Sequence, residues 1–187
     1  MADRTPLYWD SCIFYEWIGD EPVTPEKSEG VQEILSANEK GENIIVTSTI
    51  THLEVLPRKL ADKGASDEQD YLSLFDATHF HEIELTANIL LRAREIRDYY
   101  YSPLAADSGY KMMDLGDCIH LATASIYGVE QFHTRDKDRK GSKVPLLKLY
   151  EISDNPRLCG KYDLKIISPE AEEPRLDLRN GGPRDPA

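Results

Sequence analysis

The sequence contains little that would cross-link the chain or direct it through a membrane. Only 3 cysteines occur, at Cys12, Cys118 and Cys159, and no two of them form a C-x-x-C pair. An odd and scattered set of this kind argues against a disulfide framework and against a cysteine zinc cluster. No apolar run approaches the length of a membrane span, and the first residues carry no apolar signal region. We therefore expect a cytoplasmic protein without membrane spans.

Basic residues are also scarce. The 187 residues include 22 Lys and Arg against 34 Asp and Glu, which gives a formal charge of −12. A surface this negative repels phosphate, so the charge taken alone argues against a nucleic-acid partner. An acidic cluster that holds a cation, beside a local basic patch, would reverse that argument. The apolar share of 40% is ordinary for a soluble globular chain, and the length suits one domain.

Segments of strand and helix character alternate along the chain. This alternation predicts βαβ units, and hence an α/β fold in which helices cover both faces of a parallel sheet. Pro57 lacks the N–H that a continuing helix needs, so the helix around it should kink or restart there. The domain should span residues 1–168, with a flexible tail over 169–187. We expect strands over 6–9, 44–47, 79–85, 131–134 and 164–167, and helices over 25–40, 50–60, 66–77, 86–101 and 118–127.

Four acidic residues fall where the expected strands end or the following helices begin. Asp10 follows the first strand, Glu54 lies one turn into the helix after the second, Asp117 opens a buried helix, and Asp136 lies just past the fourth strand. In open α/β sheets, ligands bind beyond the carboxyl ends of the strands. Carboxylates that converge there repel one another unless a cation neutralises them. Ligation by oxygen alone suits Mg²⁺ or Mn²⁺ rather than zinc.

Each of these acids also has a purely structural interpretation. Asp10 and Asp117 could be helix N-caps, Glu54 could be a solvated helix residue, and Asp136 could be a turn acid in a charged loop. The joint pattern of four acids at one edge favours the metal site. His120 lies three residues after Asp117 and could reach that site, but we interpret it as a hydrogen-bonded histidine on a half-buried helix.

Four segments of the chain, taken together, form a recognisable pattern: Leu7–Ser11, Ser48–Glu54, Asp117–Ala124 and His133–Asp136. The third is the most specific, because it combines an acid, a histidine three residues on and a Leu-Ala-x-Ala helix. This pattern resembles the PIN-domain family, which is the nuclease fold used by the toxins of many bacterial type II toxin–antitoxin pairs. The order and spacing of all four segments match the family over about residues 6 to 168.

The resemblance implies a three-layer α/β/α sandwich with a central, mainly parallel sheet, and a Mg²⁺- or Mn²⁺-dependent ribonuclease. It also implies a homodimer and an antitoxin segment that lies across the acidic cleft. Asp10, Asp117 and Asp136 would hold the metal. By this resemblance the catalytic residues are Asp10, Glu54, Asp117 and Asp136, and the supporting residues are Ser11, Thr134, Asp114 and Asp138.

One stretch reverses the general negative charge. Residues 136–148 contain five basic and two acidic side chains, for a local charge of 5 − 2 = +3. We predict that Lys137, Arg139, Lys140 and Lys143 contact RNA phosphates beside the metal. The equally weighted alternative is a solvated charged loop.

Two other functions would use the same residues. A catalytically inactive PIN-like module would serve as an interaction scaffold, and a DNA structure-specific nuclease would share the acids. The presence of all four acids favours an enzyme, because a scaffold has no need to keep them. The function predicted from the sequence is therefore an endoribonuclease that hydrolyses RNA phosphodiester bonds, with an antitoxin as a possible partner.

Overall fold

The computed structural model describes residues 4–18, 25–58, 67–76, 80–101, 112–138 and 143–170. At its centre is a sheet of five strands in the order β3-β2-β1-β4-β5. Every neighbouring pair is parallel, as the alternation of strands and helices predicted. The strands are β1 (Thr5–Trp9), β2 (Asn43–Ser48), β3 (Phe80–Ile83), β4 (Gln131–His133) and β5 (Lys165–Ile167).

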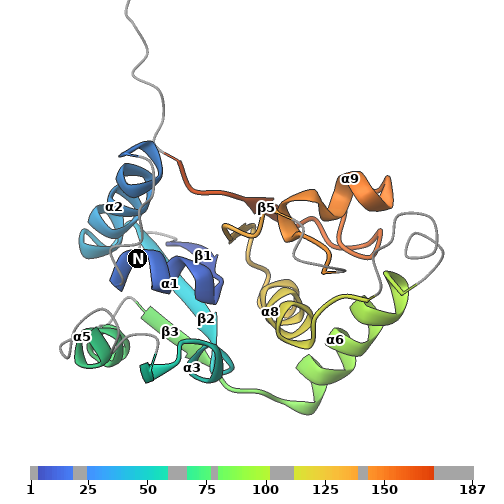
Figure 1. The fold of residues 1–187 in the computed structure, drawn as a ribbon, viewed down its shortest axis with the longest axis horizontal. Helices are drawn as coiled ribbons and strands as arrows, with labels where there is room; N and C mark the ends of the chain where they lie inside the picture. Colours follow the sequence, from blue (N-terminus) through green and yellow to red (C-terminus); the bar gives the residue numbers. More distant parts are fainter. Residues whose placement is uncertain are drawn as a thin grey trace, which may run out of the picture.

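Helices cover both faces of the sheet (Figure 1). On one face lie α1, α2 and α5, and on the other lie α6, α8 and α9, each layer with its own apolar core. The predicted three-layer α/β/α sandwich is therefore confirmed. The helices are α1 (Ser11–Ile18), α2 (Pro25–Glu39), α3 (Thr51–Glu54), α5 (Asp67–Ser73), α6 (Ala87–Tyr99), α8 (Leu115–Ile126) and α9 (Leu149–Ser153), with 3-10 turns over Leu74–Asp76 and Leu146–Lys148.

Alternation along the central strands divides the two cores. Tyr8 points to the α6 and α8 side, where its ring stacks on Phe132 with centroids 5.0 Å apart. The next residue, Trp9, points to the α1 side and meets Phe14 edge to face at 5.5 Å. Successive side chains of a strand face opposite sides of its sheet, so a two-sided core requires apolar residues at consecutive positions.

The break expected at Pro57 is present. Helix α3 ends at Glu54, and the chain becomes helical again at Pro57 and Arg58. Glu54 therefore lies at the end of a short helix rather than in the middle of a long one. This position leaves its side chain 29% exposed at the edge of the sheet.

The chain beyond β4 completes the core on the α8 side. Leu146 and Leu149, in the 3-10 turn and α9, and Leu158 and Leu164 further on, are all buried there. The sequence did not predict these two short helices. Of the predicted tail, residues 171–187 lie outside the described part of the chain. No helix among the described residues combines the length and apolarity that crossing a bilayer requires.

Candidate active site

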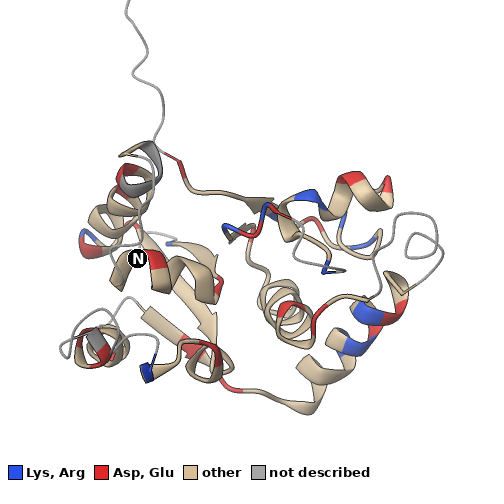
Figure 2. Cartoon of the chain, viewed as in Figure 1, with Lys and Arg blue, Asp and Glu red and all other residues tan. Residues whose placement is uncertain are grey.

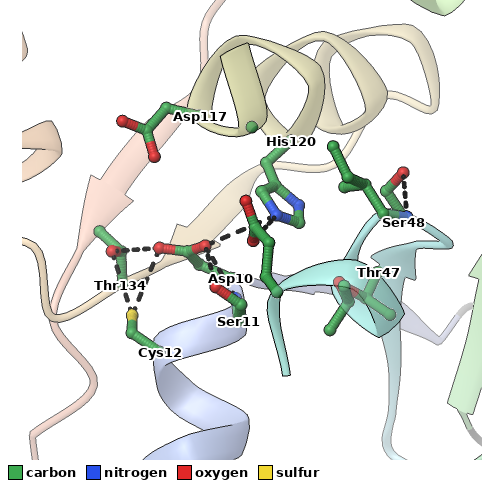
Figure 3. Close-up of polar contacts among 12 residues, drawn as sticks. Asp10, Ser11, Cys12, Thr47, Ser48, Asp117, His120 and Thr134 are labelled. Atoms are coloured by element: carbon green, nitrogen blue, oxygen red, sulfur yellow. Dashed lines mark hydrogen bonds and ion pairs between the residues drawn. The ribbon is translucent and has the colours of Figure 1, made fainter. Parts of the chain in front are cut away.

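The predicted acids gather at the carboxyl edge of the sheet. Asp10 directly follows β1, and Asp136 lies shortly after the end of β4. Glu54 is the last residue of α3, and Asp117 lies in the first turn of α8. Figure 3 shows His120 reaching from the same helix toward Asp10. Elements far apart in the sequence therefore bring the four predicted acids to one place.

Asp10 is the most densely bonded of these acids. Its Oδ1 accepts a hydrogen bond from the Ser11 N–H at 2.8 Å, and its Oδ2 accepts one from Thr134 Oγ1 at 2.7 Å. Weaker contacts come from the Ser11 hydroxyl at 3.4 Å and from Cys12 Sγ at 3.3 Å. The side chain is only 8% exposed. Because each of these contacts donates to the carboxylate, together they hold the Asp10 side chain in one orientation.

Thr134 connects the first and last acids. The hydroxyl that donates to Asp10 also accepts a hydrogen bond from the Asp136 N–H at 3.1 Å. Asp136 Oδ2 in turn accepts from the Leu146 N–H at 3.4 Å. Ser11 and Thr134 thus lie beside the acids, where the family resemblance placed them.

The half-buried Glu54 forms a pair with the buried His120. His120 Nε2 lies 2.8 Å from Glu54 Oε2, and Nδ1 lies 2.7 Å from the hydroxyl of Tyr8. Burial lowers the pKa of His120, but the hydrogen bond to Glu54 and the charge of Asp10 outweigh it and raise the pKa overall. For Glu54, burial alone would raise the pKa, but the hydrogen bond to His120 outweighs burial, and the pKa is lowered overall. The pair is therefore held together by charge as well as by hydrogen bonding.

The same three side chains form a compact group of possible ligands. One atom each from Asp10, Glu54 and His120 lie within 4.8 Å of one another. However, both ring nitrogens of His120 already have partners, so the imidazole has no lone pair to give without breaking one of these contacts. The interpretation of His120 as a hydrogen-bonded histidine is confirmed, and its partner is one of the predicted catalytic acids. We assign it as a positioning residue for Glu54.

Two further residues fix Glu54, and neither was expected from the sequence. Tyr15 on α1 donates its hydroxyl to the Glu54 carbonyl and accepts the Leu56 N–H at 2.8 Å, which fixes the end of α3. Gly116 leaves room for the carboxylate, because a Cβ at that position would lie 2.0 Å from Glu54 Oε1. In the sequence, only the position of Gly116 beside Asp117 indicated a role at the site. That role becomes clear only when the structure places α3 against α8.

Asp117 is buried, and its Oδ2 is paired with a lysine. The residue is 6% exposed, and Lys143 Nζ lies 3.2 Å from that oxygen. Burial raises the pKa of Asp117 to about 7; Lys143 opposes this shift, and the charges of Asp10 and Asp136 add to it. The N-cap of α8 is Asp114, whose side chain accepts the Gly116 N–H at 2.9 Å. The capping interpretation therefore applies to Asp114 and not to Asp117.

Of the basic residues predicted to contact RNA, one is exposed, one points toward the acids and two lie outside the described residues. Lys137 and the supporting acid Asp138 are exposed, whereas Arg139 and Lys140 lie outside the described residues. Lys137 lines a hollow of about 240 Å³ together with Lys148. Lys143 instead turns inward to the acids, with Nζ 3.2 Å from Asp117 Oδ2.

The charged residues are unevenly distributed among the helices. Figure 2 shows acidic residues recurring along α2 and α5, and basic residues along α6. Basic residues also occur around the segment that connects β4 with α9. The acids of the candidate site therefore lie within a chain whose negative charge is unevenly distributed.

The donors present fit a hard divalent cation. The carboxylates of Asp117 and Asp136 both lie within 3.5 Å of Lys143 Nζ, and the charge of Asp10 raises the pKa of each of them. Burial also raises the pKa of Asp136, although Lys143 opposes the shift. Carboxylate oxygens that destabilise one another until a cation arrives are the ligand set that Mg²⁺ and Mn²⁺ prefer.

The comparison with known protein families agrees with this geometry. The family described as the PIN domain matches residues 7–142, which is more than half of the chain. The chain belongs to the PIN domain family. All four predicted acids fall within the matched residues, whereas Lys143 and the PIN-domain protein's α9 and β5 lie beyond them.

Solved structures also resemble this PIN-domain protein, including the following two. One is the crystal structure of VapBC2 from Rickettsia felis bound to a DNA fragment from their promoter, with a TM-score of 0.54, 15% identity, and 88% of this chain and 98% of that chain covered. The other is a toxin-antitoxin complex from Klebsiella pneumoniae, with a TM-score of 0.45, 23% identity, and 69% and 85% covered. No curated protein matches the sequence. The first similarity supports the α/β/α fold.

Proposed function

We propose that this PIN-domain protein is a Mg²⁺- or Mn²⁺-dependent endoribonuclease. The observation that carries the proposal is the buried Asp117, whose ionised form is destabilised by its surroundings and by Asp10 and Asp136. A fold retains such a cluster at a cost in stability unless a ligand repays it. Asp10, Asp117 and Asp136 would hold the ion, and Glu54 would act beside it.

The chain's own residues prepare this chemistry. A bound divalent ion would supply a water of lowered pKa and would neutralise charge on the scissile phosphate. Thr134 and Ser11 keep Asp10 oriented as a ligand through bonds of 2.7 and 2.8 Å. Burial raises the pKa of Glu54, but the bond to His120 lowers it overall, so the carboxylate stays ionised at neutral pH and would orient an attacking water.

The basic residues after Asp136 would bind the substrate backbone. Lys137 is exposed close to the site in sequence, and Arg139 and Lys140 follow it. Phosphate contacts of this kind position a strand without reading its sequence. Replacing Lys137, Arg139 and Lys140 together by Glu should weaken RNA binding and flatten its dependence on salt, whereas an unchanged salt slope would contradict the assignment.

We also propose an antitoxin as a protein partner, and a homodimer as the assembly. Leu53, next to Glu54 in the sequence, and Leu115, two residues before Asp117, are 73% and 59% exposed, so apolar side chains are accessible at the end of α3 and the start of α8. An inhibitory segment with apolar side chains and a basic residue would match both that surface and the charge of −12. Replacing Leu53 and Leu115 by Ser should weaken the binding of an antitoxin. Light scattering of the protein without an antitoxin should give twice the mass of one chain, as a homodimer requires.

Cleavage of total RNA tests the enzymatic proposal. The metal-free protein should be inactive in EDTA and should cleave RNA when Mn²⁺ is added. Asp10→Asn and Asp117→Asn should each lower the rate by at least about 100-fold, which is the upper end of the effect of residues that only orient metal ligands. Asp70→Asn, at an exposed position on α5, is the matched control and should retain the rate.

Parallel reactions distinguish the two alternative functions. Single-stranded and branched DNA, incubated under the same conditions, should remain intact. Cleavage of DNA in preference to RNA would support a DNA nuclease. If Mn²⁺ raises the melting temperature of the wild type and of an Asp10→Asn, Asp117→Asn double variant alike, and no substrate is cut, the protein is a scaffold.

A further inference from the structure

Lys143 places a positive charge inside the group of acids. Its Nζ lies 3.2 Å from Asp117 Oδ2 and 3.5 Å from Asp136 Oδ2. The lysine side chain is 35% exposed, against 9% and 11% for the two acids. The ammonium therefore enters the cluster from the solvent side and contacts two of the three acids proposed to hold the metal.

The backbone beside Lys143 is anchored to the same site. The next residue, Val144, is 7% exposed, and Leu146 is 1% exposed. Leu146 and Leu147 donate their N–H groups to the carboxylate and the carbonyl of Asp136, at 3.4 and 3.0 Å. Only the flexible stem of the lysine has to rotate for the ammonium to leave or return.

The ammonium is held by an ion pair. Its Nζ lies 3.2 Å from Asp117 Oδ2, close enough for charge and hydrogen bonding to act together. A divalent ion on the same oxygen would stand at contact distance from a second positive charge, and the two would repel each other strongly in a mostly buried space. Lys143 and the ion therefore cannot both occupy this position favourably.

We propose that Lys143 is an internal counter-ion that competes with the divalent cation for Asp117 and Asp136. This inference rests on the proposed metal site. In the metal-free protein the ammonium offsets the repulsion among the acids and stabilises the fold. When the ion binds, Lys143 withdraws toward solvent, and the energy of its ion pairs is subtracted from the affinity of the site for the metal.

Titration calorimetry with Mn²⁺ on the metal-free protein tests the competition directly. Lys143→Met removes the charge and keeps most of the stem, and it should bind Mn²⁺ about tenfold more tightly than the wild type, within the usual range of coupling between two ligands of one protein. The same variant should melt at a lower temperature than the wild type in EDTA, because the acids lose their counter-ion. Lys165→Met, on the exposed face of β5, is the control and should leave both values unchanged.

The outcomes separate this inference from the metal site itself. Equal or weaker Mn²⁺ binding by Lys143→Met, with normal binding by the wild type, overturns the counter-ion role and leaves the metal site intact. No Mn²⁺ binding by either protein overturns the metal site, and the inference with it. Lys143→Gln, which keeps a polar end without charge, should behave as Lys143→Met does and decides the question if methionine disturbs folding.

Discussion

The imidazole of His120 holds the carboxylate of Glu54 through a contact of 2.8 Å between Nε2 and Oε2. This contact joins α8 to the end of α3, two elements that are distant in the sequence. On the other side of the ring, the hydroxyl of Tyr8 contacts Nδ1 at 2.7 Å. The orientation of one proposed catalytic acid thus depends on a histidine that is fully buried.

Removal of this histidine should impair catalysis more than metal binding. We expect His120→Ala to lower the rate of RNA cleavage at saturating Mn²⁺ by about 10- to 100-fold, the range found for residues that orient others in metal sites. The affinity for Mn²⁺ should change less, because Asp10, Asp117 and Asp136 remain. His120→Gln, whose amide can still reach Glu54, should recover part of the rate, and His81→Ala, at an exposed position on β3, should have no effect.

An alanine at Gly116 should separate activity from stability. Its Cβ would lie 2.0 Å from Glu54 Oε1, so the carboxylate must leave its place beside His120. We expect cleavage to fall by about tenfold or more, while the free energy of unfolding stays within about 1 kcal/mol, since alanine favours a helix over glycine. In a Glu54→Asp background, which leaves room for the methyl group, the substitution should have little further effect. Additive losses in the double variant would show that Gly116 acts through something other than Glu54.

The hydroxyl of Thr134 should contribute to the stability of the site. Thr134→Val leaves Asp10 Oδ2 and the Asp136 N–H without the partner that they share. We expect a loss of about 1–3 kcal/mol in the free energy of unfolding, measured with urea. Thr134→Ser keeps the hydroxyl and should retain most of this stability. Equal losses in the two variants would attribute the effect to packing instead of hydrogen bonding.

Much of this arrangement follows from the sequence. The alternation of strand and helix segments predicted a parallel sheet, and acids that follow parallel strands must lie at the same edge. Predicting where the first and fourth strands end was enough to locate Asp10 and Asp136. Pro57 correctly predicted where the helix that carries Glu54 is interrupted.

Other features depend on how distant elements pack. The need for glycine at position 116 arises from how closely α3 approaches α8, and no local sequence pattern predicts that approach. Lys143 belonged to a basic stretch that predicted phosphate contacts, and its inward direction depends on the anchoring of Leu146 against Asp136. The short helices after that anchor lack a clear apolar period, so their share of the core was not predicted.

The raised pKa of Asp117 predicts how stability changes with pH in the absence of metal. Burial raises the pKa of the folded-state carboxyl to about 7, from its ordinary value of 3.8. Between these values the folded protein retains a proton that the unfolded chain has lost, so rising pH destabilises the fold across this window. Asp117→Asn removes that effect.

This prediction is tested by measuring the free energy of unfolding in EDTA at about pH 4.5 and about pH 7.5, which lie near the two ends of this window. Relative to the wild type, Asp117→Asn should gain on the order of 3 kcal/mol between the lower and the higher pH. The exposed Asp70→Asn should follow the wild type at both. A difference between Asp117→Asn and the wild type that is independent of pH would show that the carboxyl titrates normally.

The proposed activity requires that distant acids share one divalent cation. An anomalous difference map from a crystal grown with Mn²⁺ would locate that ion. We expect a peak in contact with both Asp10 and Asp117, with the ammonium of Lys143 withdrawn from Asp117. A map with no peak at these carboxylates, or with Mn²⁺ only on exposed acids, would contradict the proposal.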